Sequence, residues 1–395
     1  MNNSHPIDAR PLITGDDPAA QAHYQQLVAE YGSPLLVLNR RVLQARFKAL
    51  QAALPEVDLY YAVKAHPDPE IIKIIDQLGG GFDIASAGEM SLLLDHKVSG
   101  RRTIHTHPIK KDQEIRDGLR FGATTFVIDN AHELKKLVPY RSRVGVLLRV
   151  SFRSASAIVD LSKKFGCAPD EVADLVQQAN ALGIHVKGLS FHVGSQCNDA
   201  SKHVEAITRC HALMQEINAT ANKPLSVLDI GGGFPADYAL HGLDIDAFCA
   251  PIRTALAELP KDWHLIAEPG RYLVAPSVTS VTTVAGKSVR NGFRWYYLDD
   301  GIYGSYSGQL FDHATYPLQV FRDGERLPSI IAGPTCDSID VVAENIALPE
   351  LEIGDLLIGH QMGAYTAATK TRFNSIPDAR LVVVDHPQEP PVLNS

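Results

Sequence analysis

Short apolar runs alternate with amphipathic helical patterns through the first two thirds of the chain. Eight runs have the length and composition of strands, at residues 58–64, 81–86, 103–107, 124–129, 143–150, 185–193, 226–232 and 264–269. Between them, apolar residues recur at helical spacing, as in PEIIKIIDQLG and PDEVADLVQQANALG. Eight strand–helix alternations predict an α/β protein with a (β/α)8 barrel of the TIM type. A doubly wound open sheet is the second choice, because no GxGxxG turn follows the first strand.

The pattern changes after about residue 275. Helical periodicity fades, and short β-branched or aromatic runs such as SVTSVTTVAG, FRWYYLDDG and ARLVVVDH follow one another between turns rich in Gly, Pro and Asp. This pattern predicts a second domain built on an antiparallel β-sheet. We place the barrel at residues 40–275 and the second domain at residues 20–39 and 276–395, because the early run SPLLVLNR can add a strand to that sheet.

Composition narrows the class of protein. The 395 residues are 45% hydrophobic and 21% charged, which suits two domains with sizeable cores. The net charge is −8 and no long basic run occurs, so we expect neither a nucleic-acid nor a membrane partner. The five cysteines form no CxxC pair, and the first residues do not resemble a signal peptide. We therefore expect a cytoplasmic protein with free thiols.

Ionisable residues and glycines gather where the predicted strands end, which is the edge that carries the active site in such barrels. The first strand ends in Lys64 and the eighth in Glu268. The seventh runs into the triple glycine 231–233, and the eighth into Gly270 and Arg271. Closely approaching backbone N–H groups bind phosphate, and phosphate sites in these barrels commonly follow strands seven and eight.

A phosphate cradle beside a lysine and a carboxylate predicts pyridoxal phosphate as the cofactor. The cofactor aldehyde needs a lysine, and its ring nitrogen needs a partner that sets its charge. Lys64 and Glu268 supply these two groups, and His192 is then available to stack on the ring. A phosphorylated sugar would suit the cradle but would leave the lysine and the carboxylate without a role.

Eight segments carry a family resemblance. In order they are YYAVKA, GFDIAS, LLRV, FHVGS, LDIGGGFP, EPGR, GPTCDSID and MGAYT…FN. The series resembles the fold-type III pyridoxal-phosphate decarboxylases, and within them most of all the ornithine decarboxylases with the bacterial ornithine/lysine enzymes. The resemblance runs from about residue 32 to residue 374. Two positions depart from the family pattern: His66 and His107 stand where asparagine is common.

The resemblance implies a role for each matching residue. Lys64 would be the Schiff-base lysine, Glu268 would pair with the pyridine nitrogen, and His192 would stack on the ring. Cys336 would be the catalytic acid that returns a proton to Cα of the substrate after carbon dioxide leaves. The other cofactor contacts would be Asp83, Arg149, Ser195, Gly231, Gly232, Gly233, Gly270, Arg271 and Tyr365.

The same resemblance implies a substrate and an assembly. Asp300 and Asp337 would bind the distal ammonium of a basic amino acid, with L-ornithine first and L-lysine second. In this family Cys336 and Asp337 act in the partner subunit, so a homodimer with shared active sites is expected. Arginine decarboxylases of this fold are generally longer chains, which disfavours arginine. The diaminopimelate enzymes usually have Glu after the cysteine, where this chain has Asp337.

Other classes stay open. The HTH at residues 105–107 places two histidines on one face of a strand, an arrangement typical of metal-dependent hydrolases, but it leaves the glycine loops without a role. We expect no metal. A non-catalytic relative that binds partners is a second alternative, although Lys64, Glu268, Cys336 and Tyr365 are all present. A racemase is a third, and Glu268 disfavours it because such enzymes place an arginine near the ring nitrogen.

Overall fold

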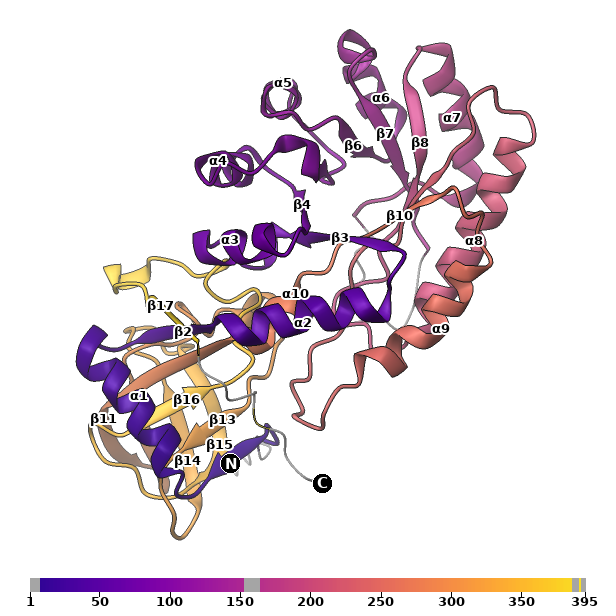
Figure 1. The fold of residues 1–395 in the computed structure, drawn as a ribbon. Coiled ribbons are helices and arrows are strands. Elements are labelled where there is room, and N and C mark those ends of the chain that lie inside the picture. Colours follow the sequence, from indigo (N-terminus) through magenta and orange to yellow (C-terminus); the bar gives the residue numbers. More distant parts are fainter. Residues whose placement is uncertain (1–7, 153–163, 386–390, 392–395) are drawn as a thin grey trace. The chain divides into compact units, whose positions relative to one another are not determined.

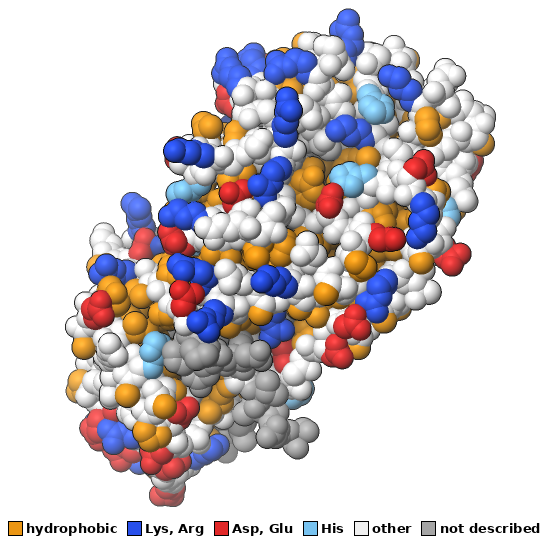
Figure 2. Space-filling view, in the orientation of Figure 1, with side chains coloured by type: hydrophobic (Ala, Val, Ile, Leu, Met, Phe, Trp, Pro, Cys, Tyr) orange, Lys and Arg blue, Asp and Glu red, His pale blue; other side chains and the backbone are white. Residues whose placement is uncertain are grey.

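The structure is a computed structural model that describes residues 8–152, 164–385 and 391 (Figure 1). The chain divides into two compact units. One consists of Gln44–Pro235 and Asp244–Tyr272, and the other of Met1–Leu43, Ala236–Leu243 and Leu273–Ser395. None of the helices in the described part of the chain is both long and apolar enough to span a membrane. On the face drawn in Figure 2, acidic and basic side chains are interspersed.

The first unit is a closed barrel of eight parallel strands, which confirms the predicted fold class. Its strands pair in the order β10-β3-β4-β5-β6-β7-β8-β9, so the last strand closes on the first. Every predicted run overlaps one of them: β3 (Val57–Ala62), β4 (Gly81–Ile84), β5 (Thr103–His105), β6 (Thr125–Ile128), β7 (Gly145–Arg149), β8 (His185–Ser190), β9 (Val227–Asp229) and β10 (His264–Ala267).

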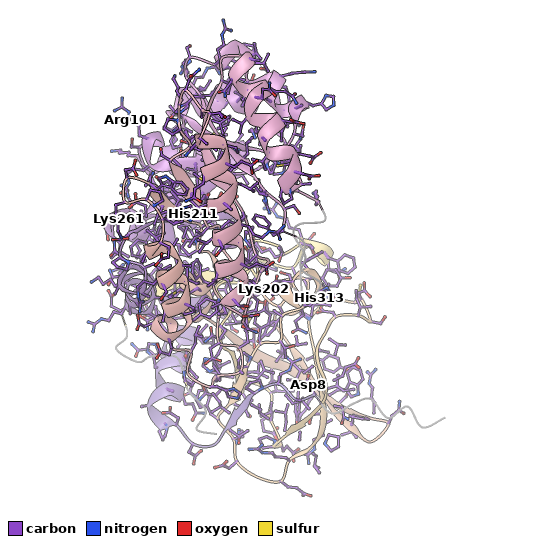
Figure 3. The ribbon with its side chains drawn as sticks, turned by 90° about the vertical axis from the view of Figure 1, so that its right-hand side faces the viewer. Asp8, Arg101, Lys202, His211, Lys261 and His313 are labelled. Atoms are coloured by element: carbon purple, nitrogen blue, oxygen red, sulfur yellow. The ribbon has the colours of Figure 1, made fainter. Side chains whose placement is uncertain are left out.

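Helices surround these strands (Figure 1). They are α3 (Pro69–Gln77), α4 (Ala87–Asp95), α5 (Asp112–Phe121), α6 (Ala131–Lys136), α7 (Val172–Ala181), α8 (Ser201–Asn218) and α9 (Ile245–Ala257). In α3 the N-cap Asp68 accepts a hydrogen bond from the backbone N–H of Glu70 at 2.8 Å, and the apolar stripe Ile71, Ile72, Ile74 and Ile75 is fully buried. His211 of α8 packs against Trp263, with ring centroids 5.5 Å apart (Figure 3).

Two further helices flank the barrel sequence. The helix α2 (Arg40–Ala53) precedes β3, and the short α10 (Arg271–Val274) follows β10. The strands themselves are fully buried at residues such as Phe82, Phe126 and Leu189. Because buried strands pack on both sides, the carboxyl ends of all eight are held rigidly at one rim.

The second unit is a nine-stranded sheet with the order β1-β13-β16-β11-β12-β14-β15, while β2 pairs with both β11 and β17. The run SPLLVLNR forms β2 and joins this sheet as predicted. The strands are β1 (Leu12–Thr14), β2 (Leu35–Asn39), β11 (Val278–Arg290), β12 (Phe293–Leu298), β13 (Leu318–Val320), β14 (Leu327–Ala332), β15 (Val341–Leu348), β16 (Leu356–Gly359) and β17 (Arg380–Val384). Its described helices are α1 (Pro18–Tyr31) and α11 (Gly308–Phe311).

The sheet is mixed rather than purely antiparallel. Three strand pairs, β1 with β13, β12 with β14, and β17 with β2, are parallel, and the other pairs are antiparallel. The expectation of an antiparallel sheet was therefore too simple. Its core contains the fully buried tyrosines Tyr296, Tyr306 and Tyr316.

Candidate active site

Lys64 lies directly after the first barrel strand, in a 3-10 turn formed by Val63–Ala65. Its amine pairs with the buried carboxylate of Asp83, the third residue of β4, and the second oxygen of that carboxylate accepts a hydrogen bond from the Thr106 hydroxyl. The parallel register sets Ala62 opposite Asp83, so the two neighbouring strands bring lysine and aspartate together. The lysine side chain keeps 38% of its surface exposed, so its amine is accessible to a ligand.

Two buried carboxyl groups face each other at the ends of β9 and β10. Burial, then the charges of Asp229 and Asp83, raise the pKa of Glu268 well above its usual value, while Lys64 acts in the opposite direction. Burial also raises the pKa of Asp229 to about 6, against a hydrogen bond with Glu268. Buried carboxyl groups in contact favour sharing one proton over two full charges. Glu268 can thus hold or release a proton at this position.

His192 is held as a neutral imidazole. Its Nδ1 accepts a hydrogen bond from the backbone N–H of Gly194 at 3.0 Å, so in the neutral ring the proton sits on Nε2. Burial lowers the pKa of His192 well below its usual value, and the charges of Arg149 and Lys64 lower it further. The ring therefore offers an uncharged face within the electrostatic reach of Lys64.

The triple glycine after β9 is a position where side chains do not fit. Gly231 has φ +66°, and a Cβ there would lie 2.1 Å from the carbonyl oxygen of Phe191. At Gly232 a Cβ would lie 2.7 Å from the carbonyl oxygen of Glu268 and 3.2 Å from Nε2 of His192. Gly233 has φ +100°. Gly232 therefore brings bare backbone between the His192 ring and the main chain of Glu268.

The loop after β10 adds a positive charge and a close contact with the lysine turn. Arg271 is buried, and its guanidinium donates a hydrogen bond of 2.8 Å to the hydroxyl of Ser195. A Cβ on Gly270 would lie 3.0 Å from Cβ of Ala65, so this loop packs directly on the turn that carries Lys64. The predicted phosphate-binding residues Ser195 and Arg271 are therefore neighbours.

These residues fit pyridoxal phosphate. The cofactor carries an aldehyde, a phosphate and a ring nitrogen, and it matches an accessible amine, a glycine cradle with Arg271 and Ser195, and an acid whose proton is mobile. At Gly231 and Gly232 a side chain would meet the carbonyl oxygens of Phe191 and Glu268, so only glycine fits this loop. Lys64, Glu268 and His192 would hold the reactive part of the cofactor.

Gly231→Ala is expected to weaken cofactor binding by about tenfold or more. An added methyl would meet the Phe191 carbonyl, and the left-handed backbone would cost about 1 kcal/mol or more for a non-glycine residue. The measurement is fluorescence titration of the cofactor-free protein with pyridoxal phosphate. The matched control is Gly88→Ala in α4, where a Cβ would come no closer than 3.8 Å to its neighbours. Equal affinity of both variants for the cofactor would contradict the assignment of this loop.

In the second unit, Cys336 and Asp337 lie on an exposed loop with aromatic and polar neighbours. The carboxylate of Asp337 accepts a 2.6 Å hydrogen bond from the Tyr303 hydroxyl, which lowers the pKa of Asp337. Tyr303 stacks on Phe373 at 4.8 Å, and the next residue, Asn374, accepts a hydrogen bond from the backbone N–H of Cys336 at 3.0 Å. An ionised Asp337 and an exposed thiol are thus presented together.

Asp300 and Tyr365 belong to the same unit but differ in environment. Asp300 is buried, and its carboxylate accepts hydrogen bonds from the backbone N–H groups of Gly301 and Ser305. Burial raises the pKa of Asp300 to about 6. Tyr365 is half-buried and has a positive φ of 54°. The predicted roles of these two residues stay predictions.

Sequence reasoning did not assign a role to three residues that shape the site. Asp229 lies inside a recognised motif but pairs with Glu268, and Thr106 completes the contacts of Asp83. His203 is fully buried in α8, where its Nε2 lies 3.1 Å from the carbonyl oxygen of Gly232 and its ring stacks on Phe234. Helical spacing toward the barrel could have indicated His203, but no local signal marks the other two.

The two histidines of HTH have separate environments. His105 is the last residue of β5, is fully buried and stacks on Phe126. His107 lies beyond the end of the strand, contrary to the predicted run, and packs edge-on against Phe165 at 5.3 Å. Within residues 8–152, 164–385 and 391, no group of three potential ligands for a metal ion occurs.

Comparison with known proteins gives a consistent result. The family model described as "Pyridoxal-dependent decarboxylase, pyridoxal binding domain" matches residues 40–275. A lysine/ornithine decarboxylase of Selenomonas ruminantium is 36% identical over 372 residues, which cover 94% of each chain.

Solved structures agree with this finding. A lysine/ornithine decarboxylase of Vibrio vulnificus, complexed with cadaverine, is similar with a TM-score of 0.89 and 47% identity, over 93% of this chain and 99% of that one. The arginine decarboxylase of Paramecium bursaria Chlorella virus, bound to agmatine, gives a TM-score of 0.86 with 29% identity, over 92% of this chain and all of that one. A decarboxylase that acts on arginine can therefore have this length. Our expectation that chain length disfavours arginine was wrong.

Proposed function

We propose that this chain, which belongs to the family of pyridoxal-dependent decarboxylases, removes the α-carboxylate of a basic L-amino acid, with L-ornithine as the preferred substrate and L-lysine as the second. The products would be putrescine and cadaverine, which feed polyamine biosynthesis. The observation that carries the proposal is the meeting of Lys64, Asp83 and Glu268 at one end of a closed barrel. The named relatives support the choice of substrates.

When bound, the cofactor supplies an electron sink for the bond that breaks at Cα. The chain supplies the charges around it. Lys64 provides the amine, and Asp83 fixes the position of that amine. Glu268, with its neighbour Asp229, holds a proton where the ring nitrogen would lie, and neutral His192 covers the ring without adding a second positive charge. These roles of single residues are part of the proposal.

The second part of the chemistry is a proton returned to Cα. A cysteine suits this step, because its proton is mobile near neutral pH. Cys336 is exposed and follows a turn, so we propose that it donates the proton in the active site of a partner subunit, with Asp337 beside it to bind the distal ammonium. In this homodimer, residues 40–275 bind the cofactor, and residues 20–39 and 276–395 complete the partner's site.

The carboxylate of Asp337 favours a substrate whose side chain ends in a single ammonium group. Asp337 is ionised and exposed enough to meet an ammonium, and it is shorter than the glutamate usual in diaminopimelate enzymes. One methylene separates ornithine from lysine, and a pocket discriminates such a difference by about 1–3 kcal/mol. Mixed activity toward both amino acids follows. All five cysteines are free thiols, which supports a cytoplasmic enzyme.

The alternative of a non-catalytic binding protein has less support. Such a protein needs neither an accessible amine nor a proton-sharing acid pair, and both are present. Glu268 equally disfavours a racemase, because a carboxyl group at the ring nitrogen strengthens the electron sink.

Carbon dioxide release is the direct test. The purified protein with pyridoxal phosphate is offered L-ornithine, L-lysine, L-arginine and meso-diaminopimelate at equal concentrations. We expect release from ornithine and lysine. Asp337→Asn is expected to raise KM for both by about tenfold, since it removes a charge-assisted hydrogen bond to the substrate. Asp323→Asn, at an exposed position of the same unit, is the control. Release from arginine or diaminopimelate alone would overturn the choice of substrate, and no release from any would favour the binding protein.

A further inference from the structure

A large pocket lies at the opposite rim of the barrel from Lys64. Its volume is about 1060 Å³, and its lining comes from the residues just before β6, β7, β8 and β9 and from the helices α7 and α8. The predicted active-site residues follow the carboxyl ends of the strands, so this pocket is at the amino ends. Pockets of about 300–1,000 Å³ are typical of small-molecule sites, which makes this one large enough for a metabolite.

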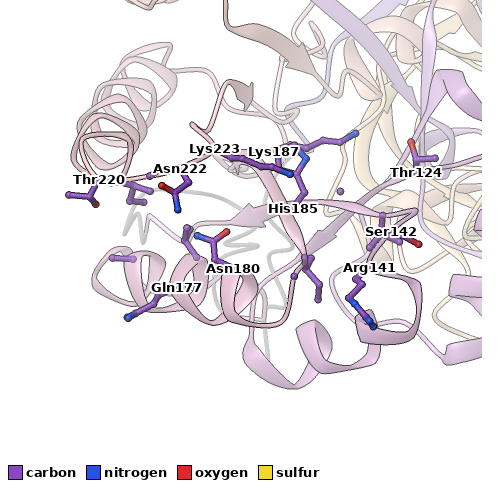
Figure 4. Close-up of a pocket in the computed structure, with 18 of the residues that line it drawn as sticks. Thr124, Arg141, Ser142, Gln177, Asn180, His185, Lys187, Thr220, Asn222 and Lys223 are labelled. Carbon is purple, nitrogen blue, oxygen red and sulfur yellow. The ribbon is translucent and has the colours of Figure 1, made fainter.

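The lining is strongly basic although the whole chain has a net charge of −8. It contains one carboxylate, Glu216, against the cations Arg141, Arg143, Lys187 and Lys223 and the imidazole of His185. Figure 4 shows His185, Lys187 and Lys223 in the same part of the pocket, with Asn180 and Asn222 to one side of them. The electrostatic neighbours of His185 are themselves cations, since Lys223 and Lys187 lower its pKa after burial does.

These cations hydrogen-bond to neutral oxygens rather than to acids. Arg141 donates to the carbonyl of Val138 at 3.0 Å, and Arg143 donates to the carbonyl of Leu119 at 3.0 Å. Neither arginine, nor Lys187 or Lys223, forms an ion pair within the part of the chain that the structure describes. The residues that line the pocket therefore carry four cations against a single acid, and a bound anion would offset this excess of positive charge.

Lys187 is held in place by the sheet. It lies on β8, and its amine donates a 2.6 Å hydrogen bond to the Thr125 hydroxyl on β6, which is two strands away. The intervening strand β7 has Gly145 at this level, where a Cβ would lie 2.3 Å from Cε of Lys187. Only glycine lets the lysine stem cross to Thr125. Burial lowers the pKa of Lys187, because its ammonium loses part of its hydration.

We propose that this pocket binds a small, multiply charged phosphate compound, of the di- or triphosphate type, at the rim opposite the catalytic lysine. A pocket with cations from three segments suits a compact polyanion, whereas an extended nucleic acid needs a continuous basic track. Because the site does not overlap the cofactor cradle, the ligand binds the holoenzyme without displacing pyridoxal phosphate. A ligand that binds only the folded barrel stabilises it. We therefore expect this ligand to change the stability or conformation of the enzyme without contacting a catalytic group.

The test is calorimetric titration of the holoenzyme, saturated with pyridoxal phosphate so that the catalytic cradle is filled, with inorganic triphosphate at low salt. We expect one site per chain, weaker binding as salt rises, and weaker binding of inorganic monophosphate. Lys187→Met and Lys223→Glu are each expected to weaken triphosphate binding about tenfold. Lys48→Glu on α2 is the control, since it makes the same change in net charge as Lys223→Glu at an exposed position outside the pocket.

Each outcome decides the proposal. Saturable binding that the two pocket variants weaken and Lys48→Glu does not would support it. Absence of saturable heat, or equal losses in all three variants, would overturn it. Tighter binding of a short RNA duplex than of triphosphate would also overturn it, in favour of a nucleic-acid surface. Thermal unfolding and basal turnover of Lys223→Glu and Lys48→Glu are expected to match those of the unmodified holoenzyme. For Lys187→Met, which loses the hydrogen bond to Thr125, unchanged basal turnover shows that the fold is kept.

Discussion

Lys64→Arg is expected to abolish carbon dioxide release, with a fall in turnover of about 10³-fold or more, while leaving the protein folded. A guanidinium keeps the positive charge that Asp83 requires, but it stays protonated and cannot act as a nucleophilic amine. Steady-state carbon dioxide release from L-ornithine is the measurement. The visible absorption of the lysine-bound cofactor is expected to disappear as well.

Lys64→Ala separates the two roles of this lysine. It removes the amine and also leaves the buried Asp83 without its cation, so it is expected to lose both turnover and thermal stability. The Thr106 hydroxyl still supports the carboxylate, so the protein should remain folded. If Lys64→Arg turned over at a rate near that of the unmodified protein, this lysine would not be the reactive amine.

Glu268→Gln is expected to lower turnover by about 10²-fold or more and at the same time to stabilise the cofactor-free protein. Turnover falls because the amide cannot hold a mobile proton at the ring nitrogen. Stability rises because the amide carries no charge. In the unmodified protein the folded-state pKa of Glu268 is raised, so its ionisation carries no penalty below the ordinary carboxyl pKa and a growing penalty as pH rises toward the folded-state value.

The pH dependence of the stability tests this prediction. In thermal unfolding of the cofactor-free protein, the stability that Glu268→Gln gains over the unmodified protein should grow from about pH 4.5 upward. Each kcal/mol recovered would raise the melting temperature by about 2–4 °C or less in a chain of this size. Glu258→Gln, at an exposed position after α9, is the control. A variant of Glu268 that melts lower at pH 8 would contradict a raised pKa.

The barrel could be predicted from sequence because each of its strands is a continuous apolar run between helical patterns. The mixed sheet could be predicted only in part. Strand β15 contains Glu344 and Asn345, which break its apolar run, and β1 has three residues. Parallel pairing, as between β12 and β14, depends on which distant strands meet, and the local alternation of side chains does not encode that choice.

The candidate site, like the fold, could be predicted only in part. Lys64 and Glu268 could be predicted because strand ends in a barrel converge on one rim, and Asp83 and Arg149 lie within the electrostatic reach of that group. Asp229 could not be assigned a role from sequence, since its effect comes from a neighbouring strand. The hydrogen bond between Tyr303 and Asp337 likewise joins residues 34 positions apart, and no spacing rule predicts it.

The closing of the barrel by β10 on β3 has a consequence for biosynthesis. The backbone N–H of Ala62 donates to the carbonyl of Pro269 at 3.1 Å, so the segments that carry Lys64 and Glu268 meet only when the last barrel strand has been synthesised. A nascent chain that ends after β9 already contains the reactive lysine and the glycine cradle, but it lacks the acid and Arg271. The cofactor is therefore bound only after the whole barrel has been synthesised. A ribosome-bound chain truncated before residue 264 should not bind pyridoxal phosphate.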